Sequence, residues 1–374
     1  MGATGRFALF ISIVLSVWSA FHVYAYLRAF SIPALARSMP PAARVVVFLL
    51  LCLTYPVGRL LATWAPGHVA RAVETAGAIW MGVLFLAVAM FLLADVVTGF
   101  GRLWPAAVVA ARVAALVAAA LLSVVALVQD ARGPRVVRYE VKVPSLPGGR
   151  SELKVVQLSD LHLGTLLGGR WLGRRVRDVN ALAPDLVVVT GDLVDAAVGP
   201  VEPLVPELGK LSAPLGVWGV TGNHEYYAGL ERSVALYEAA GIRTLRDAWG
   251  EAAPGLVLAG VDDLTARRQL GLDGRSLDRA FAGVPRDAVV VLLSHSPLLV
   301  RDAAARGARL MLSGHTHGGQ LWPFVYLSSI AYPFQAGRYD VDGMTLVVSR
   351  GTGTWGPPMR LFFRSEIVEV TLRA

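Results

Sequence analysis

The sequence predicts an α/β domain preceded by an all-α transmembrane region of about four helices. The first reason is composition: 55% of the 374 residues are hydrophobic and 17% are charged, whereas soluble domains carry about a quarter charged residues. The second is a change of pattern near residue 150, after which short apolar runs alternate with helical periodicity. We therefore expect a transmembrane region over 1–130, a linker with a lead-in strand over 131–150, and the α/β domain over 151–374.

Four apolar stretches fill the first third of the chain, and each approaches the ~20 residues that cross a bilayer core. They cover roughly 7–27, 45–64, 76–98 and 106–128. A cleaved signal peptide would explain only the first of them. We expect Asp95 and Arg112 to pair across helices or to reach the interface. His22 is expected to be a packed or interfacial residue, and Pro56 is expected to kink the second stretch.

We expect a multi-pass protein of the inner cell membrane, and the charge pattern indicates its orientation. Residues 1–130 contain eight Arg, no Lys and three acidic residues. More Arg and Lys flank the side that holds both termini, which by the positive-inside rule places the C-terminal domain in the cytoplasm. The net charge of +8 then reflects arginines facing anionic head groups, so we expect no nucleic-acid binding. The only cysteine, Cys52, excludes an intramolecular disulfide and a cysteine-based zinc site.

Short apolar runs, six of them bounded by Gly, Asp, Ser or His, and one alternating apolar and charged segment at 136–143 predict the strands of the α/β domain. The predicted strands cover 136–143, 155–158, 186–190, 216–221, 256–261, 289–293, 309–312, 344–349 and 367–372. Helical periodicity is found at 170–182, 229–240 and 297–306. About 220 residues of this kind can bury one substantial core.

Short polar clusters follow five of the predicted strands and contain five of the seven histidines. The clusters are Asp160-Leu161-His162, Gly191-Asp192, Gly222-Asn223-His224-Glu225, Ser294-His295 and Gly314-His315-Thr316-His317. Because ligands of α/β sheets bind at the carboxyl ends of strands, we expect these side chains to meet in one crevice. Mixed imidazole and carboxylate ligands suit Mn, Fe or Zn, and a set of this size suits two ions about 3.5–4 Å apart.

The order of these clusters resembles the calcineurin-like metallophosphoesterases over roughly residues 150–374. Residues 159–164, 222–227 and 349–353 are similar to the membrane-anchored bacterial phosphodiesterase branch. That branch includes UDP-2,3-diacylglucosamine pyrophosphohydrolases, which act in lipid A biosynthesis. The resemblance implies a four-layer α/β/β/α sandwich and two divalent metal ions.

The resemblance also implies a role for each polar residue. The first metal would be held by Asp160, His162 and His317, the second by Asn223, His295 and His315, with Asp192 bridging them. His224 would not bind metal but would stabilise the transition state or protonate the leaving oxygen. Glu225 replaces the Asp of many relatives, and we expect little consequence of that difference.

We therefore predict a membrane-bound dinuclear-metal phosphoesterase that hydrolyses phosphodiester or pyrophosphate bonds. Membrane tethering favours a lipid-linked or nucleotide-glycolipid substrate. Two alternatives stay open: an outward-facing phosphodiesterase of broad specificity, and a non-enzymatic membrane sensor or scaffold that uses the metal-binding domain. The aromatic segment 321–334 would lie at the lipid interface, form an acyl pocket, or pack as ordinary core.

Overall fold

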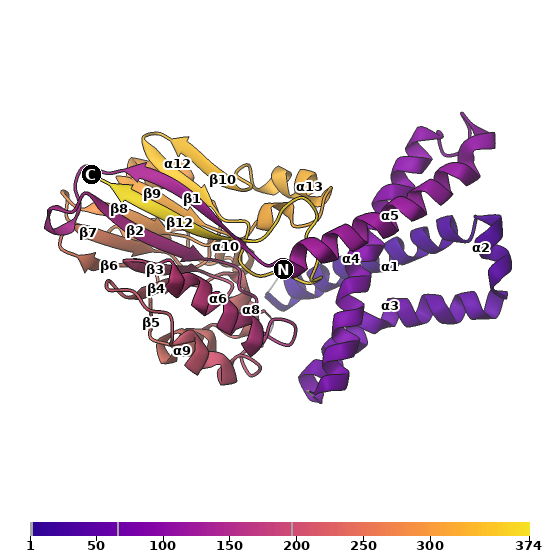
Figure 1. The fold of residues 1–374 in the computed structure, drawn as a ribbon, viewed down its shortest axis with the longest axis horizontal. Coiled ribbons are helices and arrows are strands. Elements are labelled where there is room, and N and C mark those ends of the chain that lie inside the picture. Colours follow the sequence, from indigo (N-terminus) through magenta and orange to yellow (C-terminus); the bar gives the residue numbers. More distant parts are fainter. Residues whose placement is uncertain (1–2, 66, 196) are drawn as a thin grey trace. The chain divides into compact units, whose positions relative to one another are not determined.

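The computed structural model describes residues 3–65, 67–195 and 197–374 and divides the chain into two compact units (Figure 1). One unit comprises Met1–Ala131 and Gly356–Leu361, and the other comprises Arg132–Trp355 and Phe362–Ala374. The short segment 356–361 therefore belongs with the helices, although the sequence places it inside the expected α/β domain.

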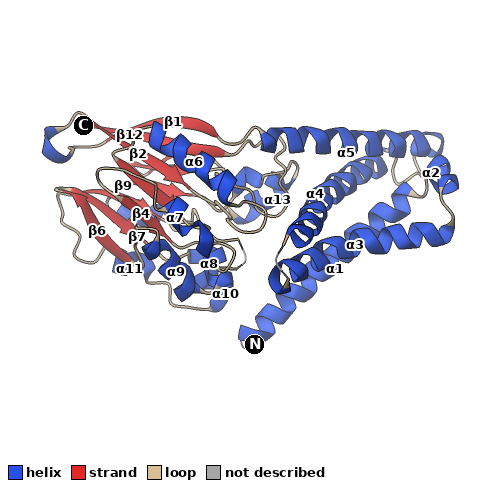
Figure 2. Ribbon diagram, turned by 60° about the horizontal axis from the view of Figure 1, so that its bottom comes forward, coloured by secondary structure: helices blue, strands red, loops and turns tan. Residues whose placement is uncertain are grey.

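The first unit is helical, as the blue ribbons of Figure 2 show. Its helices are α1 (Ala3–Ala29), α2 (Pro33–Ser38), α3 (Pro41–Trp64), α4 (His68–Val97) and α5 (Val108–Ala131). Among the residues that the structure describes, three segments are long and apolar enough to cross a membrane, namely Pro41–Ala62, His68–Val97 and Pro105–Ala131. They correspond to the second, third and fourth predicted spans, while a first span within α1 stays a prediction. Helix α3 continues through Pro56.

Polar side chains inside this unit are paired with one another. Asp95 is fully buried and lies between two arginines: Nε of Arg28 is 2.5 Å from Oδ2, and Nη2 of Arg112 is 3.3 Å from Oδ1. His22 is also buried, and its Nε2 accepts a hydrogen bond of 2.9 Å from the indole of Trp80. Asp95 and Arg112 thus pair across helices, one of the two arrangements expected from the sequence, and His22 is a packed residue.

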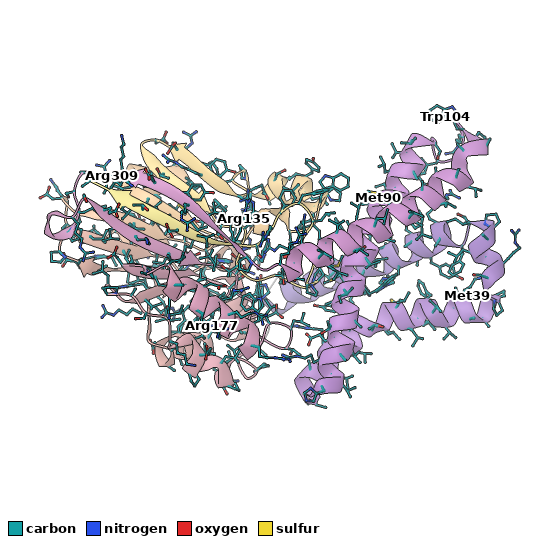
Figure 3. All side chains as sticks on the ribbon, in the orientation of Figure 1. Met39, Met90, Trp104, Arg135, Arg177 and Arg309 are labelled. Carbon is teal, nitrogen blue, oxygen red and sulfur yellow. The ribbon has the colours of Figure 1, made fainter. Side chains whose placement is uncertain are left out.

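The second unit is built on two six-stranded sheets, shown in red in Figure 2. The first sheet has the order β1-β12-β2-β3-β4-β5. Its strands are β1 (Arg135–Lys142), β12 (Glu366–Arg373), β2 (Glu152–Leu158), β3 (Leu186–Thr190), β4 (Val217–Val220) and β5 (Ile242–Thr244). Neighbouring strands are parallel except for β12 and β2. Strand β1 begins at Arg135, labelled in Figure 3, and is the predicted lead-in strand at the sheet edge.

The second sheet has the order β10-β11-β9-β8-β7-β6. Its strands are β10 (Gly337–Val341), β11 (Met344–Val348), β9 (Ala308–Ser313), β8 (Val289–Leu293), β7 (Leu256–Gly260) and β6 (Ala248–Ala253). The four central strands are parallel, and the two edge strands are antiparallel to their neighbours. Strands β5, β6 and β10 were not predicted, because they are short or only partly buried and lack a continuous apolar run.

Alternate residues of the strands bury opposite faces of each sheet. Val188 of β3 belongs to a core that also contains Val291 of β8 and Leu312 of β9, so this core joins the two sheets. Val187 faces a second core shared with helix α6, and Val290 faces a third shared with helix α12. Strands buried on both faces require near-continuous Val and Leu, which is why β3 and β8 are recognisable in the sequence.

The helices of this unit complete the fold. They are α6 (Gly169–Ala181), α7 (Val205–Leu208), α8 (Asn223–Ala228), α9 (Leu230–Ala239), α10 (Leu264–Leu270), α11 (Ser276–Ala280), α12 (Val300–Ala305) and α13 (Phe324–Ala331). Helices α6, α9 and α12 correspond to the three predicted helical segments. Helix α13 occupies the aromatic segment for which the sequence left three alternatives open. The mixed α/β class of the unit is confirmed.

Candidate metal centre

Polar side chains gather where five strands of the two sheets end. The strands are β2, β3 and β4 of the first sheet and β8 and β9 of the second, and their last residues are Leu158, Thr190, Val220, Leu293 and Ser313. Each is followed within two to four residues by a predicted ligand or by the catalytic candidate. The carboxyl ends of parallel strands share one edge of a sheet, and that edge is where α/β proteins bind ligands.

The first group contains Asp160, His162 and His317. Nε2 of His317 is 3.3 Å from Oδ1 of Asp160 and 3.1 Å from Nε2 of His162. One ligand atom from each residue lies within 4.8 Å of the others, and all three residues are buried. One carboxylate and two imidazoles at this spacing suit a single divalent cation of the Mn, Fe or Zn type.

The second group contains Asp192, His295 and His315, whose ligand atoms also lie within 4.8 Å of one another. Nε2 of His295 is 3.2 Å from Oδ2 of Asp192 and 3.2 Å from Nδ1 of His315. The amide oxygen of Asn223 is 3.2 Å from the same Nε2. The structure therefore brings together the four residues predicted for the second metal and its bridge.

Asp192 connects the two groups. Its Oδ2 lies 3.7 Å from Nε2 of His162, besides its contact with His295. A carboxylate that faces donors of both groups would suit a pair of divalent ions, because its negative charge would favour both of them. All seven predicted ligands thus lie around one centre, and their assignment to individual ions stays a prediction.

His224 is fixed from two sides. Its Nδ1 donates a hydrogen bond to the backbone carbonyl of Asp195, and its backbone N–H donates to Oδ1 of Asp192 at 2.9 Å. Because Nδ1 is used in this way, Nε2 is the ring nitrogen that can act on another group. A ring nitrogen of His224 also lies within 4.8 Å of one ligand atom each of His162 and Asp192. The prediction that it does not bind metal therefore stays a prediction.

Two histidines of the centre are each held by a hydrogen bond on one ring nitrogen. Nδ1 of His295 donates to the carbonyl of Thr190 at 2.8 Å. Nε2 of His315 is 2.8 Å from the hydroxyl of Tyr332. Nδ1 of His162 faces Oδ1 of Asp195 at 3.6 Å, which is beyond hydrogen-bond distance. Partners of this kind fix the ring orientation and the tautomer of metal-binding histidines.

Two of these partners were missed in the sequence. Asp195 was not among the residues predicted for the site, although its position three residues after Asp192 was a usable signal. Tyr332 gave no signal, because it follows His315 by 17 residues and is brought back only by helix α13.

Glu225 joins the loop after β3 to the start of α8. Its carboxylate accepts hydrogen bonds from the backbone N–H groups of Gly222 (2.6 Å), Asp192 (3.0 Å) and Val194 (3.1 Å). A buried carboxylate with three donors is well satisfied, and here it ties the end of β3 to the start of α8. The longer Glu side chain at this position therefore has a structural role that the sequence did not reveal.

Burial sets the electrostatics of the site. Burial, followed by the neighbouring His295, lowers the pKa of His315 to about 3, so this imidazole is neutral near pH 7. Neutral imidazole is the form that binds metal. Burial also raises the pKa of the Asp160 carboxyl above its ordinary value. Bound cations would offset this burial, because they favour the ionised carboxylate.

The backbone of the centre is unusual. Five of the predicted ligands have positive φ angles: Asp160 (54°), His162 (44°), Asp192 (52°), His315 (70°) and His317 (52°). A residue other than glycine in this region costs on the order of 1–3 kcal/mol, and such residues cluster at functional sites. The fold therefore holds these side chains in positions that the local chain would not adopt alone.

Two glycines make room for the carboxylates. A Cβ atom at Gly222 would overlap the carboxylate of Asp192, and one at Gly314 would overlap Ser159 and the carboxylate of Asp160. Both contacts involve atoms that cannot move without displacing a ligand. At Gly199, by contrast, a Cβ would have no neighbour within 4 Å.

We predict that Gly314→Ala lowers the metal content of the purified full chain, because the added methyl group displaces Asp160. Inductively coupled plasma mass spectrometry after dialysis would measure the metal bound per chain. Gly199→Ala is the matched control and should keep the wild-type content. Equal metal content in Gly314→Ala and Gly199→Ala would contradict this account of the site.

Comparison with known proteins agrees with this geometry. The sequence profile of calcineurin-like phosphoesterases matches residues 153–319, which include all five polar clusters. A "Transmembrane protein with metallophosphoesterase domain" of Danio rerio is 39% identical over 273 residues, and its counterpart in Bos taurus is 39% identical over 275 residues. These alignments cover 70% of this chain and 62% of each relative, so the chain matches less than two thirds of their length.

A metallophosphoesterase of Aquifex aeolicus, described as uncharacterized, is 37% identical over 243 residues, covering 64% of this chain and 92% of that protein. The donor groups and these relatives together indicate a centre for two divalent metal ions. The relatives named as transmembrane proteins and the three apolar helices indicate a membrane protein. The chain belongs to the family of calcineurin-like phosphoesterases.

Proposed function

We propose that the chain is a membrane-bound hydrolase that cleaves phosphodiester or pyrophosphate bonds at the dinuclear centre. The observation that supports this most is the convergence of seven buried or half-buried metal-binding side chains and His224 on one site. Two bound divalent ions supply charge neutralisation at the phosphoryl group and make water more acidic. The side chains of the site would hold the two ions in place.

Each side chain has a distinct part in the proposed reaction. Asp160, His162 and His317 hold one ion, and Asn223, His295 and His315 hold the other. Asp192, whose carboxylate faces donors of both groups, lies between them. The imidazolium form of His224 would donate the proton on Nε2 to the leaving oxygen, because its Nδ1–H is held by the carbonyl of Asp195.

We predict that His224→Ala reduces kcat by roughly 10²–10⁴-fold, the range typical of general acid–base groups. The measurement is release of nitrophenol from bis-nitrophenyl phosphate by the full chain with Mn²⁺. The metal content should remain near that of wild type, which separates this effect from loss of the centre. Asp192→Asn should lose both activity and metal.

His68→Ala is the control for this series, because His68 is an exposed residue at the start of α4 and lies outside the metal-binding groups. It should keep wild-type activity. Unchanged kcat in His224→Ala would exclude the proposed role of this histidine. Unchanged activity in Asp192→Asn as well would exclude the dinuclear mechanism.

We propose an amphiphilic phosphoester as the substrate, such as a lipid-linked phosphodiester or a nucleotide-activated glycolipid of the UDP-2,3-diacylglucosamine type. The support is the covalent connection of the α/β unit to the apolar helices α3, α4 and α5. A membrane-resident enzyme meets lipid substrates at high local concentration. An outward-facing phosphodiesterase of broad specificity is the alternative.

A substrate panel tests this proposal with the full chain in detergent micelles. The panel contains soluble nucleotide diesters, phospholipids and a nucleotide-activated glycolipid. We expect the highest kcat/KM for a lipid-linked member. Equal kcat/KM for soluble and lipid-linked diesters would favour the broad phosphodiesterase, and no turnover of any member would favour a sensor or scaffold.

We further propose that α1 is a fourth span and that the α/β unit lies on the cytoplasmic side of the inner membrane. The support is the length of α1, 27 residues, and the distribution of Arg and Lys. Green fluorescent protein fused after Ala374 should fluoresce in bacterial cells, whereas alkaline phosphatase fused there should be inactive. The reverse pattern would place the unit outside.

A further inference from the structure

Helix α13 exposes an apolar face. It has no buried residue, and the exposed fractions are 41% for Phe324, 65% for Tyr326, 60% for Leu327 and 82% for Ile330. Side chains three and four residues apart share one side of a helix, so Ile330 lies beside both Leu327 and Tyr326. The segment 321–337 contains no charged residue. Contiguous apolar surface of this kind marks an interaction site.

The two residues Leu321 and Trp322, just before α13, contact Phe362. Phe362 directly follows the segment 356–361 of the helical unit. Leu321 pairs with Phe362 in an antiparallel β-bridge, and the ring centroids of Trp322 and Phe362 are 6.5 Å apart. Phe362 is itself 60% exposed. The exposed aromatic surface therefore extends from α13 to Phe362.

The six residues before Phe362 are part of the helical unit. Within that unit the thioether of Met359 packs against Gly82 of α4. The backbone N–H of Arg360 donates a hydrogen bond of 3.0 Å to the carbonyl of Ala126 in α5. Helices α4 and α5 are two of the three candidate spans. The exposed aromatic surface is thus one peptide bond away from a segment packed on membrane helices.

The end of α13 contacts the metal centre. Tyr332 follows the last residue of the helix, and its hydroxyl lies 2.8 Å from Nε2 of His315 and 3.0 Å from Oγ1 of Thr265. Before the helix, the side-chain amide of Gln320 exchanges two hydrogen bonds, of 2.9 and 3.1 Å, with the backbone of Trp355. Both ends of α13 are therefore anchored, one of them on a predicted metal ligand.

We propose that α13 docks on the surface of a lipid bilayer, with Tyr326, Leu327 and Ile330 inserted at the boundary of head groups and acyl chains. Lipid is the binding partner of this surface for two reasons. The same chain carries apolar helices that place a bilayer nearby, and Tyr and Trp favour the membrane interface. The helix has no charge to hydrate or to pair with a polar partner. This docking does not depend on which phosphoester the centre hydrolyses.

A consequence concerns the centre itself. Since Tyr332 contacts His315, lipid bound to α13 holds the metal-binding loops close to the bilayer surface. A substrate whose phosphoester lies in the head-group region would then reach the centre without leaving the membrane. This step rests on the proposed function, whereas the docking of α13 is measurable without any turnover.

The test uses the full chain with Cys52→Ser, so that a single new cysteine can carry an environment-sensitive fluorophore. Leu327→Cys and Ile330→Cys place the label on α13. Leu272→Cys is the matched control, because Leu272 is also an exposed leucine of the α/β unit but lies outside α13. Each labelled protein is reconstituted in nanodiscs of phosphatidylcholine and phosphatidylglycerol, with or without phosphatidylcholine that carries a nitroxide near its head group.

We expect the nitroxide lipid to quench the labels at 327 and 330 by about two-fold, as for a helix buried at the interface, and to leave the label at 272 unchanged. Quenching at 327 and 330 no greater than at 272 would overturn the proposal. Labels at 327 and 330 that are shielded from the lipid quencher but report self-association between chains would also overturn it, in favour of a second copy as the occupant.

Discussion

The burial of several carboxylates and imidazoles at one place is the constraint on which the rest of this structure depends. Asp160, Asp192 and His295 are almost completely shielded from water. An ionised group moved from water into a protein costs several kcal/mol unless it is paired. Backbone donors supply part of that pairing, from His224 to Asp192 and from His315 to Asp160. Divalent cations would supply the remainder, so the burial that is costly for these groups alone favours metal binding.

Two sheets are needed to hold such a site. The ligands follow β2, β3 and β4 of one sheet and β8 and β9 of the other, and the apolar core between the sheets keeps these strand ends together. Five ligands adopt left-handed backbone conformations, which persist only where the surrounding structure over-determines them. Buried strands of Val and Leu provide that rigidity, and Glu225 adds hydrogen bonds between loops of different strands.

The membrane helices and the metal centre are connected through the chain itself. Helix α5 leads into β1, and the segment 356–361 returns to pack on α4 and α5 between Trp355 and Phe362. The ring of Trp355 lies 6.3 Å from that of His224. Residues next to the proposed acid are therefore continuous with residues packed on the apolar helices. A hydrolase of membrane-resident phosphoesters would benefit from such a connection, because it limits how far the centre can move from the lipid.

Local patterns in the sequence determined the α/β class, the buried strands, the apolar helices and the predicted ligands. Each of these depends on residues within a few positions of one another: residues 186–189 are a continuous apolar run, and Asp160 and His162 lie two positions apart in one loop. Beyond the meeting of the five polar clusters, which the sequence also predicted, tertiary structure alone decided which distant groups meet. Tyr332 reaches His315, Glu225 reaches the N–H of Asp192, and segment 356–361 packs on helices more than 200 residues earlier. These contacts leave no periodic signal, because a hydrogen bond or a packed side chain depends on spatial proximity rather than on spacing along the chain.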